Sequence, residues 1–317
     1  MMRQRMLGQL KVSAVGMGCM GFSTGYGEIP SEDESIRLIR LAHELGCTLF
    51  DTAEVYAIFR NEELVGKALE PIRDEIVLSS KYSPMALPGQ ENFTEGKLTR
   101  AGLHHALEDS LKRLIAEGKI RGWGLSEVSA DQIRRAHAVT PLTAVESEYS
   151  MMARQWEPTE LDTCKELGIG FMAYSPMAGG LLSGKIKTDT EFKGDDIRRT
   201  ITRYSKENVE RNQPVVELVK KFAAEKNATP AQISLAWVMH REFVVPIPGM
   251  RRDERIKENL GAADVELSAD EYDQLTAELD KLKVYGNRTD EDIAKLGALA
   301  RNKLFGSSGV PVKGLDK

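Results

Sequence analysis

Short apolar runs alternate with amphipathic helical patterns along nearly the whole of this 317-residue chain. Strands that alternate with helices in this way form a parallel sheet with the helices outside it. The apolar runs that we predict to be strands cover residues 12–16, 48–52, 76–81, 120–126, 144–149, 170–175 and 243–247. The alternation therefore predicts an α/β fold with seven parallel strands.

The segments between these runs have apolar residues at helical spacing. In the first, Ser31 and Glu34 have capping-box spacing, and the apolar face continues through Leu45 to a stop at Gly46. One longer helix carries an apolar face over 103–114. The remaining helices are predicted at about 61–69, 130–139, 157–167, 207–226, 229–240, 252–260 and 268–281, with one more near 289–304.

Two architectures fit a chain of this length, a single barrel or a doubly wound sheet. The doubly wound reading rests on Gly16-Met-Gly18-Cys-Met-Gly21, which formally matches a dinucleotide-binding fingerprint. That fingerprint must open a helix, but residues 22–30 contain Gly and Pro at positions that no helix tolerates. We therefore expect one (β/α) TIM barrel over residues 1–317, with a polar tail from about 282 and its chemistry at the strand C-termini. The glycines can still allow close backbone approach to a ligand.

Composition narrows the classes of function. A net charge of -5 gives no field that would recruit nucleic acid or an anionic membrane. The first residues lack the apolar core of a signal peptide, and no apolar run reaches membrane-spanning length. Three scattered cysteines, Cys19, Cys47 and Cys164, lack metal-ligand spacing and suggest reduced thiols. We expect a cytoplasmic protein without a metal, whose oligomeric state the sequence leaves open.

Three polar residues follow two neighbouring strands. Asp51 ends one apolar run, Tyr56 follows five residues later, and Lys81 ends the next run. On one rim of a parallel sheet they could transfer a proton to a carbonyl oxygen. A nearby ammonium should lower the pKa of a tyrosine from its usual value near 10, and Asp51 could hold that ammonium in place. Each residue also has a structural reading, as a turn cap, a packed ring or a solvated lysine.

A cluster of arginines follows the last strand. Arg251, Arg252 and Arg255 lie before and within the first turn of a helix, where cations oppose the helix dipole unless an anion binds there. Guanidinium groups suit a phosphate ester such as the ribose 2′-phosphate of NADP. A solvated turn paired with Asp253 and Glu254 remains the alternative on charge alone.

Several ordered motifs between about Leu7 and Leu282 resemble the aldo-keto reductases. They are Gly18-Cys-Met-Gly21, Leu49-Phe-Asp-Thr-Ala-Glu-Val-Tyr56, Asn61-Glu-Glu-Leu-Val-Gly-Lys-Ala-Leu69, Ser110-Leu-Lys-Arg-Leu114, Glu117-Gly-Lys-Ile-Arg121, Gly124-Leu-Ser-Glu127, Glu146-Ser-Glu-Tyr-Ser150, Tyr174-Ser-Pro176 and Thr229-Pro-Ala-Gln232. The resemblance implies a (β/α)8 barrel that reduces a small carbonyl substrate with NADPH.

By this resemblance Tyr56 is the proton donor, with Asp51 and Lys81 as its partners. Ser126 and Glu146 should hold the nicotinamide carboxamide, Tyr174 should stack on the nicotinamide ring, and Arg255 should bind the 2′-phosphate. The positions matched to the whole cofactor site are Gly18, Cys19, Met20, Ser126, Glu146, Tyr174, Ser175, Pro176, Met177, Gly179, Gly180, Leu181, Gly249, Arg251, Arg255, Glu258 and Asn259. Those from Ser175 to Leu181 would line the pyrophosphate, and Glu258 and Asn259 the adenine.

The chain departs from the family pattern in two places. Position 146 is usually Gln, and Glu146 can donate to the carboxamide oxygen only when it is protonated. The larger departure is the absence of a strand that carries the family's catalytic histidine, together with most of the helix that follows it. Here Leu114 runs almost directly into Glu117-Gly-Lys-Ile-Arg121, so that unit is absent.

None of the five histidines replaces the missing one by position. His43, His104, His105, His137 and His240 all fall in or at the end of helices. The adjacent pair at 104–105 does not suggest a metal site, because consecutive helix residues point about 100° apart.

The missing unit leaves four alternatives. The barrel could close with seven strands, stay open where the eighth strand would lie, or have that position filled by a partner, or the sequence could omit part of the natural chain.

The family's histidine hydrogen-bonds the developing oxyanion, and losing one such donor costs roughly 10²–10³ in rate. We expect an NADPH-dependent reductase of aldehydes or ketones, with an NADPH-binding regulatory protein or a non-functional deletion product as alternatives.

Overall fold

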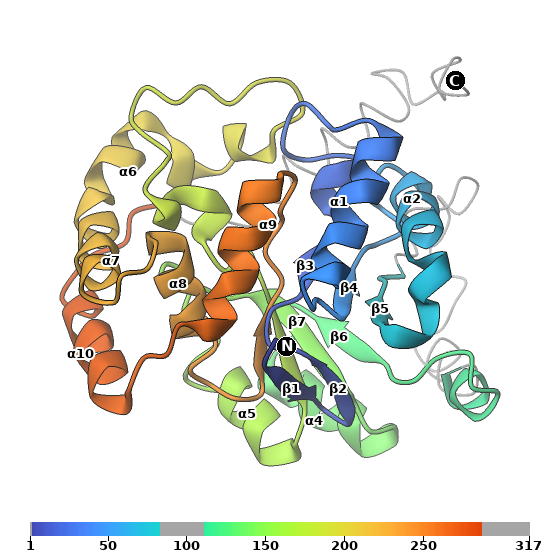
Figure 1. The fold of residues 1–317 in the computed structure, drawn as a ribbon. Coiled ribbons are helices and arrows are strands. Elements are labelled where there is room, and N and C mark those ends of the chain that lie inside the picture. Colours follow the sequence, from blue (N-terminus) through green and yellow to red (C-terminus); the bar gives the residue numbers. More distant parts are fainter. Residues whose placement is uncertain (1, 83–110, 287–317) are drawn as a thin grey trace, which may run out of the picture.

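The computed structural model describes residues 2–82 and 111–286 (Figure 1). It begins with an antiparallel hairpin of β1 (Gln4–Leu7) and β2 (Leu10–Ser13). Gly8 makes the turn with a φ of 57°, a left-handed conformation in which glycine carries little strain. A side chain at Gly8 would meet the carbonyl oxygen of Thr143 at 2.4 Å, because the hairpin lies against the start of β7.

Within residues 2–82 and 111–286, seven parallel strands follow and form two sheets. The first sheet contains β3 (Met17–Gly18), β4 (Leu49–Asp51) and β5 (Val77–Ser79). The second contains β6 (Gly124–Ser126), β7 (Ala144–Glu148), β8 (Gly170–Tyr174) and β9 (Val244–Pro246). Within each sheet the strands are paired in chain order, so every connection is a strand–helix–strand crossover of the kind expected for α/β barrels.

Backbone contacts join the two sheets between β3 and β9. Gly18 forms a parallel bridge with Gly249, and the N–H of Gly16 donates to the carbonyl oxygen of Pro246 at 2.9 Å. The strands therefore follow one another as β5-β4-β3-β9-β8-β7-β6, a curved barrel-like wall. The predicted α/β barrel class is confirmed.

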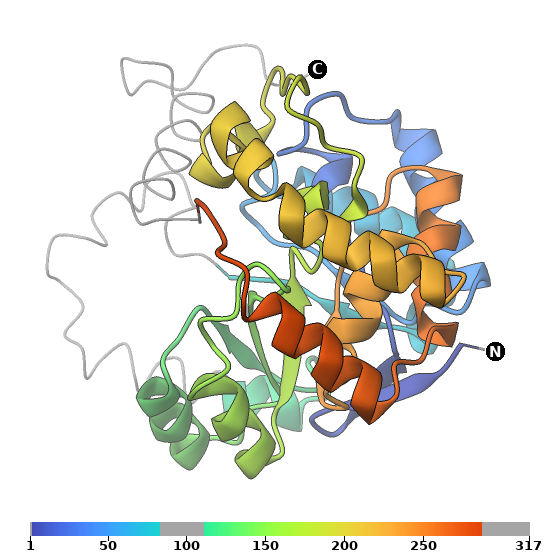
Figure 2. The ribbon, with the colours of Figure 1, turned by 90° about the vertical axis from the view of Figure 1, so that its left-hand side faces the viewer.

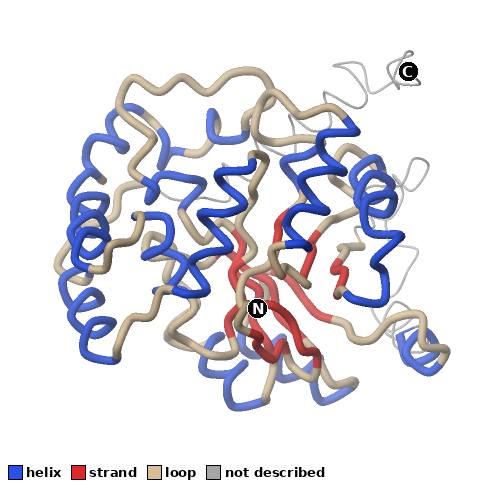
Figure 3. Tube along the Cα trace, in the orientation of Figure 1, coloured by secondary structure: helices blue, strands red, loops and turns tan. Residues whose placement is uncertain are grey.

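Helices cover the outside of this wall, and the strands gather inside them (Figures 1 and 3). Their bounds are α1 (Glu32–Glu44), α2 (Arg60–Leu69), α4 (Ala130–Val139), α5 (Glu160–Leu167), α6 (Lys206–Arg211), α7 (Gln213–Glu225), α8 (Pro230–Val238), α9 (Asp253–Leu260) and α10 (Ala269–Leu279). Neighbouring helices contact each other around the wall, α1 with α2 and α9, and α7 with α8 and α10 (Figure 2).

The apolar faces of the helices meet the sheet in two main clusters. The larger cluster includes Phe171 of β8, Trp237 of α8 and Phe222 of α7, which are 0–2% exposed. The second surrounds β3 and β4 and includes Phe50 and Leu38. Burying one such side chain contributes about 1.5–3 kcal/mol, so these clusters hold the strand ends at fixed positions.

Three predicted elements were wrong in detail. The strand predicted at 12–16 is divided, because residues 10–13 pair back onto β1 and the first parallel strand starts only at Met17. The helix predicted at 207–226 is two helices, since Asn212 ends α6 and Pro214 lies in the first turn of α7, where it has no N–H to donate to the preceding turn. The strand predicted at 120–126 is shorter, Gly124–Ser126.

The first helix has half of its predicted capping box. The Ser31 side chain accepts from the N–H of Glu34, whereas the carboxylate of Glu34 pairs with Arg37 at 2.7 Å. The predicted helix at 289–304 lies outside the described residues, as does most of the one at 103–114, whose residues 111–116 are helical.

The strands at the two ends of the wall differ from those between them. β4 and β9 are buried throughout, but all of β5 is only partly buried, and Gly124 and Ser126 of β6 are exposed. Over residues 2–82 and 111–286, no ladder pairs β5 with β6. The histidine-bearing unit implied by the family resemblance would lie between these two strands.

In the described ranges, no helix combines the length and the apolar character needed to cross a membrane. The cytoplasmic location remains a prediction.

Candidate active site at the strand carboxyl ends

The three predicted catalytic residues come together. The Lys81 ammonium lies 2.7 and 2.6 Å from the two carboxylate oxygens of Asp51 and donates to the carbonyl oxygen of Thr52 at 3.0 Å. The same ammonium lies 5.3 Å from the centre of the Tyr56 ring. Asp51 is positioned by the β3–β4–β5 ladder, and Lys81 follows β5 by two residues. The predicted rim is therefore formed.

Burial makes the Asp51–Lys81 pair a fixed element of the site. The side chain of Asp51 is 4% exposed and that of Lys81 is 24% exposed. Burial lowers the pKa of Lys81, but the charges of Asp51 and the neighbouring acidic groups raise it by more. The net pKa of Lys81 is therefore above its ordinary value. Lys81 is therefore a cation in the resting site at neutral pH, and removing either partner would leave an uncompensated buried charge.

Tyr56 does not have the lowered pKa predicted from the sequence. Burial raises the pKa of the Tyr56 hydroxyl, and the Lys81 ammonium lowers it by less than burial raises it. The negative charges of Asp51 and Glu146 also raise it. Sequence reasoning weighed the lysine alone and could not weigh the burial of the ring. Tyr56 is thus a neutral hydroxyl, which is the form that can donate a proton.

The turn after Tyr56 is strained. Ala57, Ile58 and Phe59 have φ values of 55°, 40° and 61°, in a region that residues with a side chain rarely adopt. Each such residue costs about 1–3 kcal/mol, and strain of this kind concentrates at functional sites. The turn redirects the chain into α2 and leaves Tyr56 at the rim.

Glu146 joins the same cluster from β7. Its carboxylate lies 3.2 Å from the Lys81 ammonium, and its side chain is 10% exposed. Burial raises the pKa of Glu146 from an ordinary 4.5 to about 8, and the charge of Asp51 adds to that shift. Glu146 is therefore largely protonated at neutral pH. In that form it can donate to a carboxamide, as the Gln expected at this position would.

Asn61 is a positioning residue that sequence reasoning missed. It is fully buried and donates to the carbonyl oxygen of Cys19 at 3.0 Å and to the Ser23 hydroxyl at 2.7 Å, while accepting from Thr52 at 2.5 Å. It thereby ties together the segments that follow β3 and β4, beside the candidate catalytic residues. The sequence showed it as the first residue of a family-like motif at the start of α2, where an amide is usually interpreted as a cap.

The segment after β8 has the backbone of a ligand-binding loop. Ser175, Ala178, Gly179 and Gly180 all have positive φ. A side chain at Gly179 would meet the Tyr204 hydroxyl at 2.2 Å, so only glycine fits there. Pro176, Met177 and Leu181 lie in the same turn, and Tyr174 ends β8 opposite Glu148 of β7. Loops of this shape bring backbone N–H groups close to a ligand.

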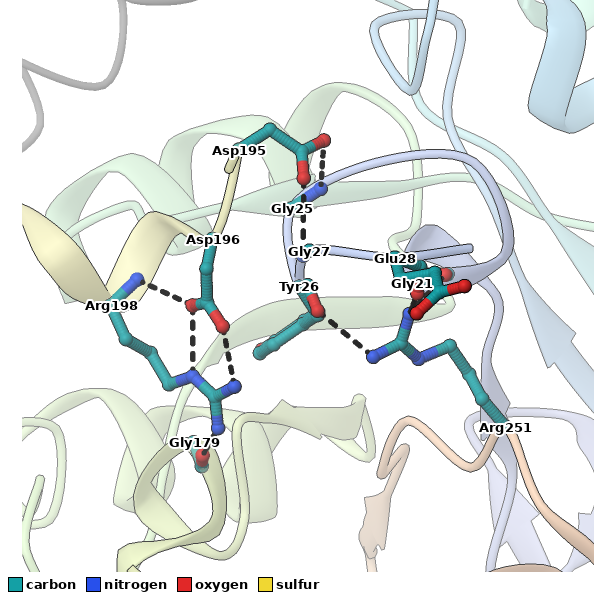
Figure 4. A network of polar contacts seen from close by, with 10 residues as sticks. All are labelled: Gly21, Gly25, Tyr26, Gly27, Glu28, Gly179, Asp195, Asp196, Arg198 and Arg251. Atoms are coloured by element: carbon teal, nitrogen blue, oxygen red, sulfur yellow. Dashed lines mark hydrogen bonds and ion pairs between the residues drawn. The ribbon is translucent and has the colours of Figure 1, made fainter. Parts of the chain in front are cut away.

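The loop after β3, which carries Gly18, Cys19 and Met20, is tied to the one after β8 (Figure 4). In that second loop Asp195 accepts from the N–H groups of Gly25 at 3.3 Å and Gly27 at 3.1 Å. Its neighbours Asp196 and Arg198 pair at 2.6 Å, and Arg198 donates to the carbonyl oxygen of Gly179 at 3.1 Å.

Arg251 holds the loop after β3 from its other side. Its guanidinium donates to the carbonyl oxygens of Gly21, Tyr26 and Glu28 at 3.3, 3.0 and 2.6 Å (Figure 4). Three backbone acceptors thus already engage this side chain. Arg255, one turn further on, pairs with Glu258 at 2.5 Å. Among the described contacts, Arg251 donates to three backbone carbonyls, whereas Arg255 has one partner, Glu258. Arg255 is therefore the better placed of the two to bind a phosphate.

Asn259 has a buried oxygen that fits a donor ligand. It is 1% exposed on α9, and its side-chain oxygen has no hydrogen-bond partner among the described residues. An unpaired buried acceptor costs about 1–3 kcal/mol unless something donates to it. The amino group of an adenine is such a donor. Gly249 lies opposite Gly18 where the sheets join.

The described histidines do not enter the site. His43 lies 3.3 Å from Glu75, the His137 ring accepts from the N–H of Leu142, and His240 stacks on Tyr272 at 3.8 Å. All three are engaged elsewhere, as their helical positions predicted. His104 and His105 lie outside the described residues.

Comparisons with known proteins agree with this geometry. A sequence model of the Aldo/keto reductase family matches residues 14–116 and 109–280. The chain is similar to aldo-keto reductase str7 of Strobilurus tenacellus, with 35% identity over 329 residues, 93% of this chain and 96% of the relative. Because 329 aligned positions exceed the 317 residues of this chain, the relative has residues that this chain lacks.

Solved structures of the same kind match as well. An aldo/keto reductase from Klebsiella pneumoniae, in complex with NADP and acetate, has a TM-score of 0.64 and 25% identity, covering 92% of this chain and 99% of that one. A glycerol dehydrogenase from Gluconobacter oxydans has a TM-score of 0.74 at 22% identity, covering 89% and 96% of the two chains, and supports the fold alone.

Proposed function

The chain belongs to the aldo/keto reductase family, and on that premise we propose that it reduces an aldehyde or ketone with NADPH. The observation that supports this most strongly is the buried Asp51–Lys81 pair beneath Tyr56. A neutral tyrosine hydroxyl beside a fixed ammonium can give its proton to a carbonyl oxygen, and the ammonium then stabilises the tyrosinate that forms.

The described residues fit NADPH. The unpaired oxygen of Asn259 suits the adenine, Arg255 the 2′-phosphate, and the left-handed turn at 175–181 the pyrophosphate. Protonated Glu146 and Ser126, which are paired in register on β7 and β6, suit the nicotinamide carboxamide. When bound, the cofactor supplies the hydride that adds to the carbonyl carbon. The protein supplies the proton, the orientation and the buried setting.

The test is NADPH oxidation by the purified protein with a panel of aromatic and aliphatic aldehydes. We expect Tyr56→Phe to lower kcat by about 10²–10⁴, the usual contribution of a positioned acid, while NADPH still quenches tryptophan fluorescence. Tyr82→Phe is the matched control, because Tyr82 is 60% exposed beside Lys81 and should retain full turnover. No turnover by the folded wild type, or equal turnover in Tyr56→Phe, contradicts the proposal.

A second candidate is an NADPH-binding regulatory protein with little catalysis. It is favoured by the absence, among the described residues, of a pairing between β5 and β6, where the family resemblance places the histidine strand. NADPH binding without turnover of any aldehyde would support it. A cooperative thermal transition that NADPH raises would exclude a deletion product that cannot fold.

A further inference from the structure

The catalytic cluster contains two buried carboxyl groups and one ammonium. Asp51 and Glu146 are 4% and 10% exposed at their side chains, and both contact Lys81. If both carboxyl groups were ionised, the cluster would carry an unbalanced negative charge with little water to solvate it. Burying an uncompensated charge costs several kcal/mol, so the cluster retains one extra proton instead. The question is which group carries it.

The geometry places that proton on Glu146. Lys81 contacts both oxygens of Asp51 at 2.6 and 2.7 Å, but reaches a single oxygen of Glu146 at 3.2 Å. The closer, two-point contact favours the ionised form of Asp51. Burial raises the pKa of both carboxyl groups, and the charge of Lys81 lowers it in both. The negative charge of Asp51 raises the pKa of Glu146 further, so Glu146 is the group that keeps the proton.

Lys81 connects this proton to the catalytic hydroxyl. The ammonium lies 5.3 Å from the centre of the Tyr56 ring, where its charge favours the tyrosinate, and it also contacts Glu146. The titratable groups that act on Glu146 are Asp51 and Lys81, and Tyr56 lies beyond Lys81. Its register neighbours, Ser126 on β6 and Met172 on β8, do not titrate at neutral pH. Ser126 is exposed, so the β6 side of Glu146 is near solvent.

We propose that Glu146 is the proton reservoir of the site and that it restores Tyr56 through Lys81 after each reduction. This proposal deepens the carbonyl reduction proposed above and rests on it. When the carbonyl oxygen takes the Tyr56 proton, the tyrosinate takes a proton from Lys81. The amine of Lys81 then takes one from Glu146, whose carboxylate is reprotonated by water from the β6 side. Each proton moves one position, and the cluster returns to its starting charge.

The first test reads the proton directly and needs no turnover. Infrared difference spectra of the cofactor-free protein between pH 6 and 10 should show a protonated-carboxyl band that disappears with a midpoint near 8. The band should be absent in Glu146→Gln, which keeps the size of the side chain. Glu160→Gln is the matched control, since Glu160 is a buried carboxyl that accepts from the N–H of Ala130, outside the cluster. A titrating band that survives in Glu146→Gln overturns the proposal.

The second test is the pH profile of kcat. Above the midpoint the wild type should lose about tenfold in kcat for each pH unit, as one essential proton is lost. Glu146→Gln should lose that dependence and turn over about tenfold more slowly at pH 7. Identical profiles in the two proteins would overturn the relay while leaving carbonyl reduction in place. No turnover by the wild type at any pH would instead overturn the proposed function, and the relay with it.

Discussion

The two places where the sheets could meet are very different. Between β3 and β9, which we term the joined edge, the Gly18–Gly249 bridge and buried strands continue the wall without interruption. Between β5 and β6, the free edge, the described backbone forms no ladder and β6 is largely exposed. The contacts that cross it among residues 2–82 and 111–286 are made by side chains, such as Arg121, which donates to the carbonyl oxygen of Ile76 at 2.5 Å.

This difference places the residues proposed for cofactor binding at one edge and those proposed for proton transfer at the other. Arg255, Asn259 and Gly249 follow β9 at the joined edge, where packing on both sides fixes the proposed cofactor contacts. Lys81 follows β5 and Ser126 ends β6 at the free edge, where fewer of the described residues surround the candidate catalytic group. We therefore expect cofactor binding to be robust and proton transfer to depend on a few buried polar contacts.

The largest effect on stability should come from Lys81→Met. Lys81 links β5 to Asp51 of β4 and Glu146 of β7, and its loss leaves buried acids without a counter-ion. Breaking a buried pair in this way typically costs about 3–5 kcal/mol, measurable by urea unfolding at pH 7. Lys67→Met is the control, because its pair with Glu32 is 59% exposed on both sides and its loss should cost far less than the loss of Lys81. Equal costs would mean that the free edge does not depend on this pair.

Glu146→Gln should make stability less dependent on pH. The pKa of Glu146 is raised from 4.5 to about 8 by burial, so the folded protein binds more protons than the unfolded chain between these values. Glu146 therefore contributes most to the stability of the folded wild type below pH 4.5, and this contribution is lost as the pH rises through 8. Removing the group should stabilise the protein at pH 9 by an amount on the order of 3 kcal/mol, relative to pH 5. Parallel stability curves for the two proteins would refute the raised pKa.

Arg255→Ala tests the joined edge. If Arg255 binds the 2′-phosphate, its loss should weaken NADPH binding about 10–100-fold, the worth of one charged hydrogen-bond pair, and leave NADH binding unchanged. Arg252→Ala is the matched control, since that side chain is 74% exposed and lies 4.0 Å from Glu254. Fluorescence titration with both nucleotides measures the four affinities. A similar loss for NADPH and NADH would show that Arg255 does not read the phosphate.

The contrast also explains what the sequence could predict. The order of strands, the rim residues Asp51, Tyr56 and Lys81, and most helices follow from local patterns and ordered motifs. The raised pKa of Tyr56 and the buried network of Asn61 depend on which groups surround them, which no local pattern contains. The N-terminal strand was misassigned for the same reason, because residues 10–13 pair with β1 rather than with the barrel. The sequence thus predicted which residues come together, but it did not predict how deeply they are buried and how burial shifts their pKa values.

The smallest effect, and the sharpest comparison of the two edges, should come from paired glycine substitutions. A Cβ at Gly18 would lie 2.8 Å from the carbonyl oxygen of Ile247, and one at Gly124 would lie 2.2 Å from that of Ala144. On contact distance alone Gly124→Ala should be the worse change. We expect the opposite order, because exposed β6 can move outward whereas β3 is held between β4 and the end of β9. Gly18→Ala should cost about 1–3 kcal/mol, the usual range for overpacking, and Gly124→Ala less. Urea unfolding of the two variants decides the order, and a larger cost at Gly124 would show that β6 is held as firmly as the joined edge.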